Sequence, residues 1–278
     1  MRKLISLFVS ALFAVAAWAE EPLSGEYVDL GLSVKWATCN LGATSSTAAG
    51  WYLAWGETSP KTNYTWATYL SDLGGTMTRW QDAGTEKDPL KEYVYFGANY
   101  SKGIGGTAYD AATAALGAGY RMPTQTEFAE LANTSNCTWE WYAKDNTEFN
   151  GVAGYKVTSK KEGFTDKFIF LPAAGFLNGD YLNYEGLDGL YWSSTPDPDL
   201  AGYAYQLYFY SDDVDPDSYD NRDYGFPVRP VYDGPDTTPT AIESVNTDNA
   251  GKVTKTIENG KVVIIRGDKK YDLSGREL

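Results

Sequence analysis

The chain has 278 residues, and 37 acidic against 23 basic side chains give it a formal net charge of −14 at neutral pH. This balance argues against nucleic acid as a partner, because nucleic acid attracts basic surfaces. Histidine is absent, which removes the commonest general base and a frequent zinc ligand and excludes a Ser-His-Asp triad. The many Tyr, Trp and Gly residues (22, 9 and 28) predict a β-rich domain with many loops.

Residues 1–19 have the pattern of a signal peptide. Arg2 and Lys3 form a positive start, an apolar run follows, and residues 17–19 (Ala-Trp-Ala) match an A-x-A cleavage site. The apolar run is too short to span a bilayer comfortably. We therefore expect an exported protein that is secreted, at the cell surface or in the periplasm, with no membrane insertion of the mature chain.

The first part of the domain is predicted to contain short strands and one long loop. Residues 26–38 alternate between apolar and polar types, a pattern typical of a half-buried strand or hairpin. A short buried strand is expected over 50–57, which is rich in aromatic residues. From 58 to 102 the pattern becomes irregular, with spaced aromatics. We interpret these aromatics as side chains that hold the loop on the core, and a functional loop is the alternative.

Two short helices are expected in the middle of the chain. The first is predicted over 107–116, with Thr107 as its N-cap and Gly117 as its stop. The second follows Thr124, because Thr124 and Glu127 form a capping-box pattern in which each side chain bonds the backbone N–H of the other residue. Three apolar residues share one face of this helix and predict that it packs against a sheet: Phe128, Leu131 and Ala132.

The rest of the main domain is predicted to be β-structure joined by loops. Strands are expected over 154–159, 167–171, 190–195, 203–210 and 225–231, the first two as a hairpin. Long loops are expected over 173–189, 196–199 and 211–223, of which the last two are acidic.

A linker is predicted over 233–244, where Asp, Gly, Pro and Thr gather. Beyond it, residues 245–278 are expected to form a small C-terminal β-hairpin module, because Asn259-Gly260 between two strand-like segments is a strong hairpin signal. The chain is thus expected to contain a signal peptide (1–19), a main domain (20–232), the linker and the β tail.

Cys39 and Cys137 are the two cysteines of the chain. In an exported protein an even number favours a disulfide. Such a bond would stabilise the fold by roughly 4–5 kcal/mol in the chain-entropy model. Two buried free thiols are the alternative, because sequence alone does not show that the two Cα atoms come within reach. We expect the disulfide.

The expected loop 173–189 combines amides, carboxylates and tyrosines. Tyr and Asn supply contact area and adaptable hydrogen bonds, a composition suited to recognition. A loop that packs its own tyrosines is the alternative. The candidate binding residues are Asn178, Asp180, Tyr181, Asn183, Tyr184 and Glu185. No residue is assigned to catalysis.

The expected loop 211–223 is the densest acidic segment of the chain. Carboxylates are the hard oxygen ligands that Ca²⁺ takes, but the spacing is not that of an EF-hand. A solvated acidic loop is the commoner outcome of such a composition. The candidate calcium ligands are Asp212, Asp213, Asp215 and Asp217. No other cofactor is expected.

Six motifs occur in order along the main domain: residues 27–43, 54–57 (Ala-Trp-Gly-Glu), 119–124 (Gly-Tyr-Arg-Met-Pro-Thr), 170–176, 191–194 and 225–231. They resemble exported Bacteroidetes proteins of the Fibrobacter succinogenes major paralogous domain family over about residues 26–232. The resemblance implies an α+β, C-type-lectin-like fold, in the branch shared with formylglycine-generating enzymes. In this fold short helices flank small antiparallel sheets with long surface loops. Residues 255–276 are similar to the end of a type IX secretion sorting domain, and a small independent β-module is the alternative.

Two departures limit what this resemblance implies for function. Formylglycine-generating enzymes use a cysteine pair late in their domain, and no cysteine follows Cys137. Calcium-dependent lectins show Glu-Pro-Asn or Gln-Pro-Asp before Trp-Asn-Asp, whereas this chain has Trp-Ser-Ser at 192–194 and no such tripeptide. The resemblance therefore implies the fold, but it implies neither the chemistry of formylglycine-generating enzymes nor the calcium-dependent sugar binding of lectins.

Two functions from different classes remain. The leading hypothesis is an exported, non-catalytic recognition or adhesion module whose loops 173–189, 196–200 and 211–224 bind a glycan or a surface protein. The alternative is a carbohydrate-active enzyme that uses paired carboxylates. The chain is rich in carboxylates, but the sequence does not fix a pair.

Overall fold

The structure is a computed structural model that describes residues 26–70, 78–81, 92–95, 101–234, 253–258, 261–266 and 269–271. The chain forms two compact units, Met1–Pro235 and Asp236–Leu278, and each is described by itself. The expected signal peptide and most of the expected linker lie outside the described residues. None of the helices within these ranges has the length and hydropathy needed to span a bilayer.

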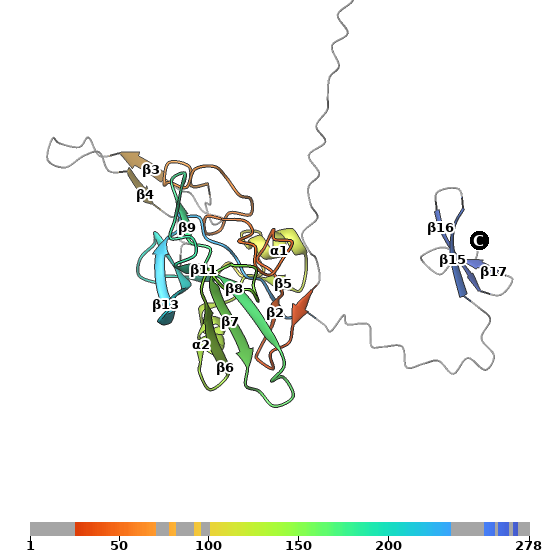
Figure 1. Ribbon diagram of the computed structural model, residues 1–278. Helices are drawn as coiled ribbons and strands as arrows, with labels where there is room; N and C mark the ends of the chain where they lie inside the picture. Colours follow the sequence, from red (N-terminus) through yellow and green to blue (C-terminus); the bar gives the residue numbers. More distant parts are fainter. Residues whose placement is uncertain are drawn as a thin grey trace, which may run out of the picture. The chain divides into compact units, whose positions relative to one another are not determined.

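The larger unit consists mostly of small antiparallel sheets with few helices, an architecture that fits the expected α+β class and a mainly β class alike (Figure 1). Its helices are α1 (Ala111–Leu116) and α2 (Gln125–Ala132). Its strands within the described ranges are β1 (Tyr27–Val28), β2 (Lys35–Ala37), β3 (Thr78–Gln81), β4 (Glu92–Tyr95), β5 (Tyr120–Arg121), β6 (Cys137–Tyr142), β7 (Gly154–Ser159), β8 (Phe168–Pro172), β9 (Phe176–Asn178), β10 (Tyr181–Asn183), β11 (Gly189–Pro196), β12 (Tyr203–Tyr210), β13 (Asp213–Asn221) and β14 (Val231–Tyr232).

A four-stranded sheet in the order β1-β2-β14-β5 joins the start, the middle and the end of the unit. β1 and β2 form the hairpin expected over 26–38, with Val28 opposite Trp36. The strand expected over 225–231 is wrong, because regular pairing begins only at Val231. Pro227 and Pro230 explain the difference, since proline has no backbone N–H to donate to a ladder. The strand expected over 50–57 is also reduced, to a single bridge between Leu53 and Phe226.

Helix α1 begins four residues later than the start expected at residue 107. Asp110 is its N-cap, and its carboxylate accepts from the backbone N–H groups of Ala112 and Thr113. The same carboxylate also accepts from the N–H of Met122, so one buried side chain fixes the helix start and the strand that follows. Gly117 ends the helix as expected, with a φ of 84° that favours glycine.

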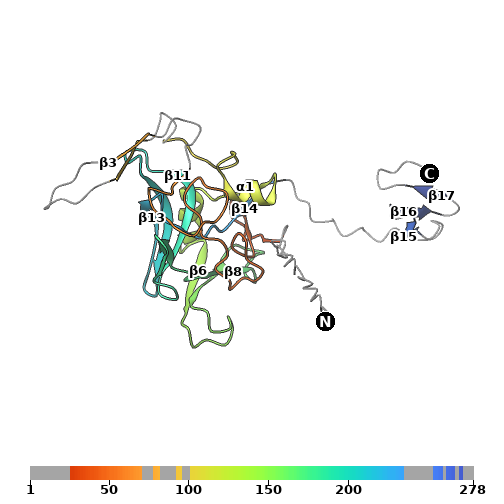
Figure 2. The same cartoon turned by 90° about the horizontal axis from the view of Figure 1, so that it is seen from above.

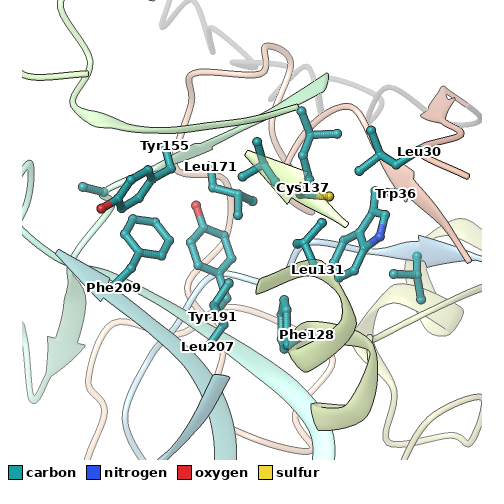
Figure 3. Packing of buried hydrophobic residues seen from close by; sticks show 14 of the residues in the cluster. Leu30, Trp36, Phe128, Leu131, Cys137, Tyr155, Leu171, Tyr191, Leu207 and Phe209 are labelled. Carbon is teal, nitrogen blue, oxygen red and sulfur yellow. The ribbon is translucent and has the colours of Figure 1, made fainter. Parts of the chain in front are cut away.

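Helix α2 has the capping box expected from the sequence. The Thr124 side chain accepts from the N–H of Glu127, and the Glu127 carboxylate accepts from the N–H of Thr124. Of the predicted apolar face, Phe128 and Leu131 are fully buried as expected, and Ala132 is half-buried. Figure 3 shows both side chains directed towards Trp36. The ring centroids of Trp36 and Phe128 are 5.6 Å apart.

Two three-stranded sheets make up most of the remaining core. The first has the order β6-β7-β8 and includes the hairpin expected over 154–171. The second has the order β11-β12-β13, and both views show its strands running together (Figure 2). Leu171 and Val157 from the first sheet and Tyr191, Leu207 and Phe209 from the second share one buried cluster. A second cluster contains Trp55, Trp192 and Phe226, together with Tyr64 and Tyr69 from the long segment after residue 58.

The expected acidic loop 211–223 is wrong, because residues 213–221 form the edge strand β13. Val214 packs against the buried cluster opposite Phe209, while Asp213 and Asp217 are exposed. Pro216 lies where the register shifts between Gln206 and Tyr208, and an edge strand tolerates proline at such an irregularity. Charged residues are suited to an edge strand because they discourage pairing with another chain.

The expected loop 173–189 contains a second unexpected hairpin, β9–β10. Asn178 pairs with Tyr181 across a two-residue turn at Gly179 and Asp180. Gly179 has a φ of 63°, which this tight turn requires. Leu177 exchanges two backbone hydrogen bonds with Gly225, so the hairpin is attached to the domain through β9. β10 is the outer strand of this two-stranded sheet.

Cys39 and Cys137 are free thiols in the structure, and the expected disulfide between them stays a prediction. Cys137 starts β6 and is fully buried in the cluster with Trp36 and Leu131 (Figure 3). Cys39 is half-buried beyond β2, beside a narrow cavity lined by Leu116 and Tyr120. The two side chains thus lie in different surroundings.

The C-terminal unit forms a three-stranded sheet in the order β15-β16-β17 (Val253–Glu258, Lys261–Arg266 and Lys269–Tyr271). β15 and β16 are joined across residues 259 and 260, which agrees with the hairpin predicted from Asn-Gly. β3 and β4 form a further antiparallel pair inside the segment expected to be irregular.

Candidate functional site

The predicted binding residues lie on the β9–β10 hairpin and on the turn that follows it. Tyr181 and Tyr184 are 74% and 57% exposed, unusually high for large rings. Asn178, Asp180 and Glu185 are also exposed, and Asn183 is half-buried. The Asn183 side-chain amide donates to the carbonyl of Tyr181 at 3.0 Å, which stiffens the strand. The alternative of a loop that packs its own tyrosines holds in part, because Tyr184 stacks on Phe176 with ring centroids 6.1 Å apart.

A groove of about 820 Å³ lies beside this hairpin, and three segments line it. Trp141 of β6 and the following Ala143 and Lys144 form one side. Residues 184–188, which follow β10, form the second side. Tyr208, Tyr210 and Ser211 at the end of β12 form the third. This volume is within the usual range for a small-molecule site.

The alternation of β12 places two tyrosines in the groove. Successive side chains of a strand point to opposite faces. Leu207 and Phe209 are fully buried on the core side, whereas Tyr208 is half-buried and Tyr210 is exposed. The rings of Tyr208 and Tyr210 are 5.9 Å apart. A continuous aromatic wall results.

Tyr155 of β7 fixes the side of the groove formed by Trp141. Its ring packs edge-on against Trp141, with centroids 5.1 Å apart and planes at 70°. Its hydroxyl donates to the carbonyls of Tyr210 and Ser211, each at 3.1 Å. Tyr155 therefore connects the sheet that carries Trp141 to the end of β12. The two aromatic sides of the groove are held together by a buried side chain.

The turn after β10 is tightly constrained. Tyr184 has a φ of 55°, and its carbonyl accepts from the N–H groups of Leu187 and Asp188 at 2.9 and 3.0 Å. A non-glycine residue in this conformation costs energy that the surrounding contacts must supply. The N–H of Gly186 donates to the carbonyl of Ala173 at 2.6 Å, which ties the turn to the domain. The turn therefore presents its side chains in a fixed arrangement.

Asp188 is a carboxylate of the groove whose pKa is shifted by its surroundings. Partial burial raises its pKa, and a hydrogen bond from the Tyr208 hydroxyl to Oδ2 at 3.3 Å opposes that rise. The same surroundings raise the pKa of Tyr208 to about 12, with burial as the main cause and the Asp188 charge next. Tyr208 thus stays a hydroxyl donor at neutral pH. Because the Tyr208 proton is donated to Asp188, the pair offers oxygen acceptors to a ligand.

The candidate calcium ligands do not converge on one point. Asp213 and Asp215 lie on β13 opposite Tyr210 and Tyr208, and Asp217 accepts a hydrogen bond from the Gln125 side chain. Asp212 lies in the turn before β13. Over the described ranges, no group of three or more His, Cys, Asp or Glu side chains is arranged to hold a metal ion. The acidic strand instead borders the tyrosines of the groove.

Sequence reasoning found part of this site. Of the predicted residues, Tyr184 and Glu185 line the groove, whereas Asn178, Asp180, Tyr181 and Asn183 lie on the hairpin beside it. Trp141, Asp188 and Tyr208 were missed. A signal for Tyr208 was present, because tyrosines alternate with Leu207 and Phe209 along residues 207–210.

Comparisons with protein-family models, with curated proteins and with solved structures find no match to this chain. The groove and the residues that form it are therefore the features that bear on function.

Proposed function

We propose that this chain is an exported recognition module that binds a glycan in the aromatic groove. The observation that carries the proposal is the arrangement of Trp141, Tyr184, Tyr208 and Tyr210 around one open groove with a few polar groups. Pockets of this type, mostly apolar with a small number of placed polar groups, are typical of binding sites. Export is supported by the signal-peptide pattern of residues 1–19.

The chemistry of the groove suits a sugar ring. A pyranose presents C–H groups on its faces and hydroxyls around its edge, so it needs flat apolar walls and hydrogen-bonding groups together. Aromatic rings provide such walls at a low entropic cost. Asp188 and the oxygen of the Tyr208 hydroxyl provide acceptors, and the Lys144 ammonium provides donors. The fixed turn at 184–188 supports a preformed site.

We also propose that the larger unit has a C-type-lectin-like fold and belongs with the Fibrobacter succinogenes major paralogous domain proteins. The six ordered motifs between residues 27 and 231 support this assignment, as do the small antiparallel sheets flanked by two short helices within the described residues. We propose that the C-terminal β unit is a sorting tail of the type IX kind, which its similarity over residues 255–276 supports.

Titration of the purified protein with a panel of neutral oligosaccharides tests the proposed function. Tyr184→Ala and Tyr210→Ala should each weaken binding by about two- to tenfold, because an aromatic contact is worth roughly 0.5–1.5 kcal/mol. Both side chains are at least partly exposed, so the melting temperature should change little. Tyr219→Ala is the matched control, since Tyr219 is an exposed tyrosine of β13 outside the groove. Equal losses for all three variants would contradict the assignment of the groove.

A second function, glycoside hydrolysis, is favoured by one observation. Asp188, whose pKa is raised, and Glu185 line the same groove, and glycosidases use one carboxyl as an acid and another as a nucleophile or base. Release of reducing ends from the bound oligosaccharides, abolished in Asp188→Asn and in Glu185→Gln, would establish this activity. Binding without any turnover would leave recognition as the function.

A further inference from the structure

A second pocket of about 330 Å³ adjoins the aromatic groove. Its own walls come from residues 47 and 49, 151–153 and 172–174, which are mostly small. It shares three lining residues with the groove: Lys144, Glu185 and Gly186. The two cavities are therefore neighbours on either side of one short bridge.

The bridge is formed by the Lys144 side chain lying across Gly186. The Lys144 ammonium donates to the carbonyl of Glu185 at 3.2 Å. A Cβ atom placed on Gly186 would collide with Cε of Lys144, so only glycine lets the lysine lie this close. Gly186 also has a φ of 74°, which favours glycine. An ammonium has three donors, and this hydrogen bond uses one of them.

Hydrogen bonds hold the wall of the second pocket in place. The hydroxyls of Tyr191 and Tyr52 donate to the carbonyls of Pro172 and Ala174 at 2.7 and 2.6 Å. Ala173 exchanges further backbone bonds, donating to Ala153 and accepting from Gly186. These contacts fix residues 172–174 from the core side. The pocket is therefore a preformed cavity, as binding sites usually are.

We propose that the ligand is a linear oligosaccharide of at least two rings that crosses Lys144 and occupies both cavities. This proposal rests on the proposed function. One ring stacks on the tyrosines of the groove, and the next ring enters the small-residue pocket, whose alanine and glycine walls leave it room. The Lys144 ammonium, held between the two, donates to the linkage or to a hydroxyl beside it. A ligand of a single ring would leave one cavity unused.

The test is a length series. Gluco-, manno-, galacto- and xylo-oligosaccharides of one to six rings are titrated into the full chain by calorimetry. For the series that binds, affinity should rise about tenfold between one ring and two or three rings, then level off. Thr47→Trp, which fills the second pocket alone, should abolish this rise while leaving the affinity for one ring unchanged. Thr134→Trp, the same change at an exposed residue outside both cavities, should behave as wild type.

The outcomes separate this inference from the proposed function. Equal affinity for one ring and for longer chains would overturn the two-cavity proposal and leave the groove as the binding site. A length effect that persists in Thr47→Trp would overturn it as well. Failure of every oligosaccharide to bind the folded protein would overturn the proposed function, and the two-cavity proposal with it.

Discussion

Protonation of Asp188 should make the affinity of the groove for its ligand depend on pH. Burial raises the pKa of this carboxyl above its ordinary value, so it becomes protonated at a higher pH than a free aspartate. If its charge accepts a hydrogen bond from the glycan, affinity should fall as the pH is lowered through that raised pKa. Asp188→Asn should bind more weakly at neutral pH, with an affinity that no longer changes in this range. Calorimetric titrations across the acidic range measure both, and parallel pH profiles for the two proteins would refute this role.

Asp223 is a buried carboxyl away from the groove. Its side chain is 4% exposed, and Oδ1 has no hydrogen-bond partner among the residues that the structure describes. Burial is the main cause that raises its pKa to about 7, and Asp220 and Glu57 add to the rise while Lys61 opposes it. Between the ordinary value of 3.8 and about 7, the unfolded chain releases this proton and the folded chain retains it. The stability due to the protonated form is therefore complete below about pH 4 and lost as the pH rises through 7.

Asp223→Asn should remove this dependence on pH. The variant cannot ionise, so above pH 7 it should be more stable than wild type by on the order of 2 kcal/mol. Near pH 4 the two proteins should differ little. Thermal unfolding at a series of pH values measures the effect, and Asp199→Asn, an exposed aspartate, is the control. A difference between variant and wild type that is the same at every pH would show that Asp223 is not the titrating group.

At the scale of single elements, two variants of helix α2 compare how much its N-cap and its buried face contribute to the free energy of unfolding. Thr124→Ala removes one half of the capping box and should cost about 1 kcal/mol. Phe128→Ala should cost more, roughly 3–5 kcal/mol, because the ring is fully buried between the helix and Trp36 and its removal leaves a cavity. Urea unfolding of both variants measures the difference in free energy. Small and equal effects would contradict the burial of this helix face.

The elements that could be predicted from the sequence are those whose cause is local. The capping box of α2 and the hairpin of β7 and β8 follow from a few neighbouring residues. β13 could not be predicted, because its composition of Asp, Pro and Ser disfavours strands and only its partner β12 makes it one. β9–β10 was missed although its two turn residues, Gly179 and Asp180, form a glycine-first pair that is typical of two-residue hairpins.

The groove could be predicted only in part, because its residues come from distant parts of the chain that the tertiary structure brings together. Tyr184 and Glu185 are in a segment whose composition indicates recognition. Trp141 and Tyr208 are separated by more than sixty positions and meet only because Tyr155 joins their sheets. Residue type and spacing in the sequence do not show that two such distant residues line the same groove. The assignment of a groove therefore required the tertiary structure.

Charge is the property of the whole molecule that bears on the ligand. The chain has a formal net charge of −14, and part of it lies next to the groove. Asp215 and Asp213 on β13 are directly opposite the groove residues Tyr208 and Tyr210. Asp188 and Glu185 line the groove itself, where Lys144 is the cation. A negative potential in a cleft repels ligands of the same sign, and the repulsion weakens as salt is added.

Neutral oligosaccharides should therefore bind more tightly than uronic-acid oligosaccharides of equal length. We expect a difference of about tenfold or more at low salt, which shrinks as the ionic strength rises beyond roughly 0.1–0.2 M, where the screening length falls below about 10 Å. The double variant Asp213→Asn with Asp215→Asn should bind uronic-acid chains more tightly and neutral chains as wild type does. Asp166→Asn, in the exposed turn between β7 and β8, should change neither. If uronic-acid chains bind wild type better than neutral chains at low salt, then Lys144 rather than the acidic strand determines the preference of the groove.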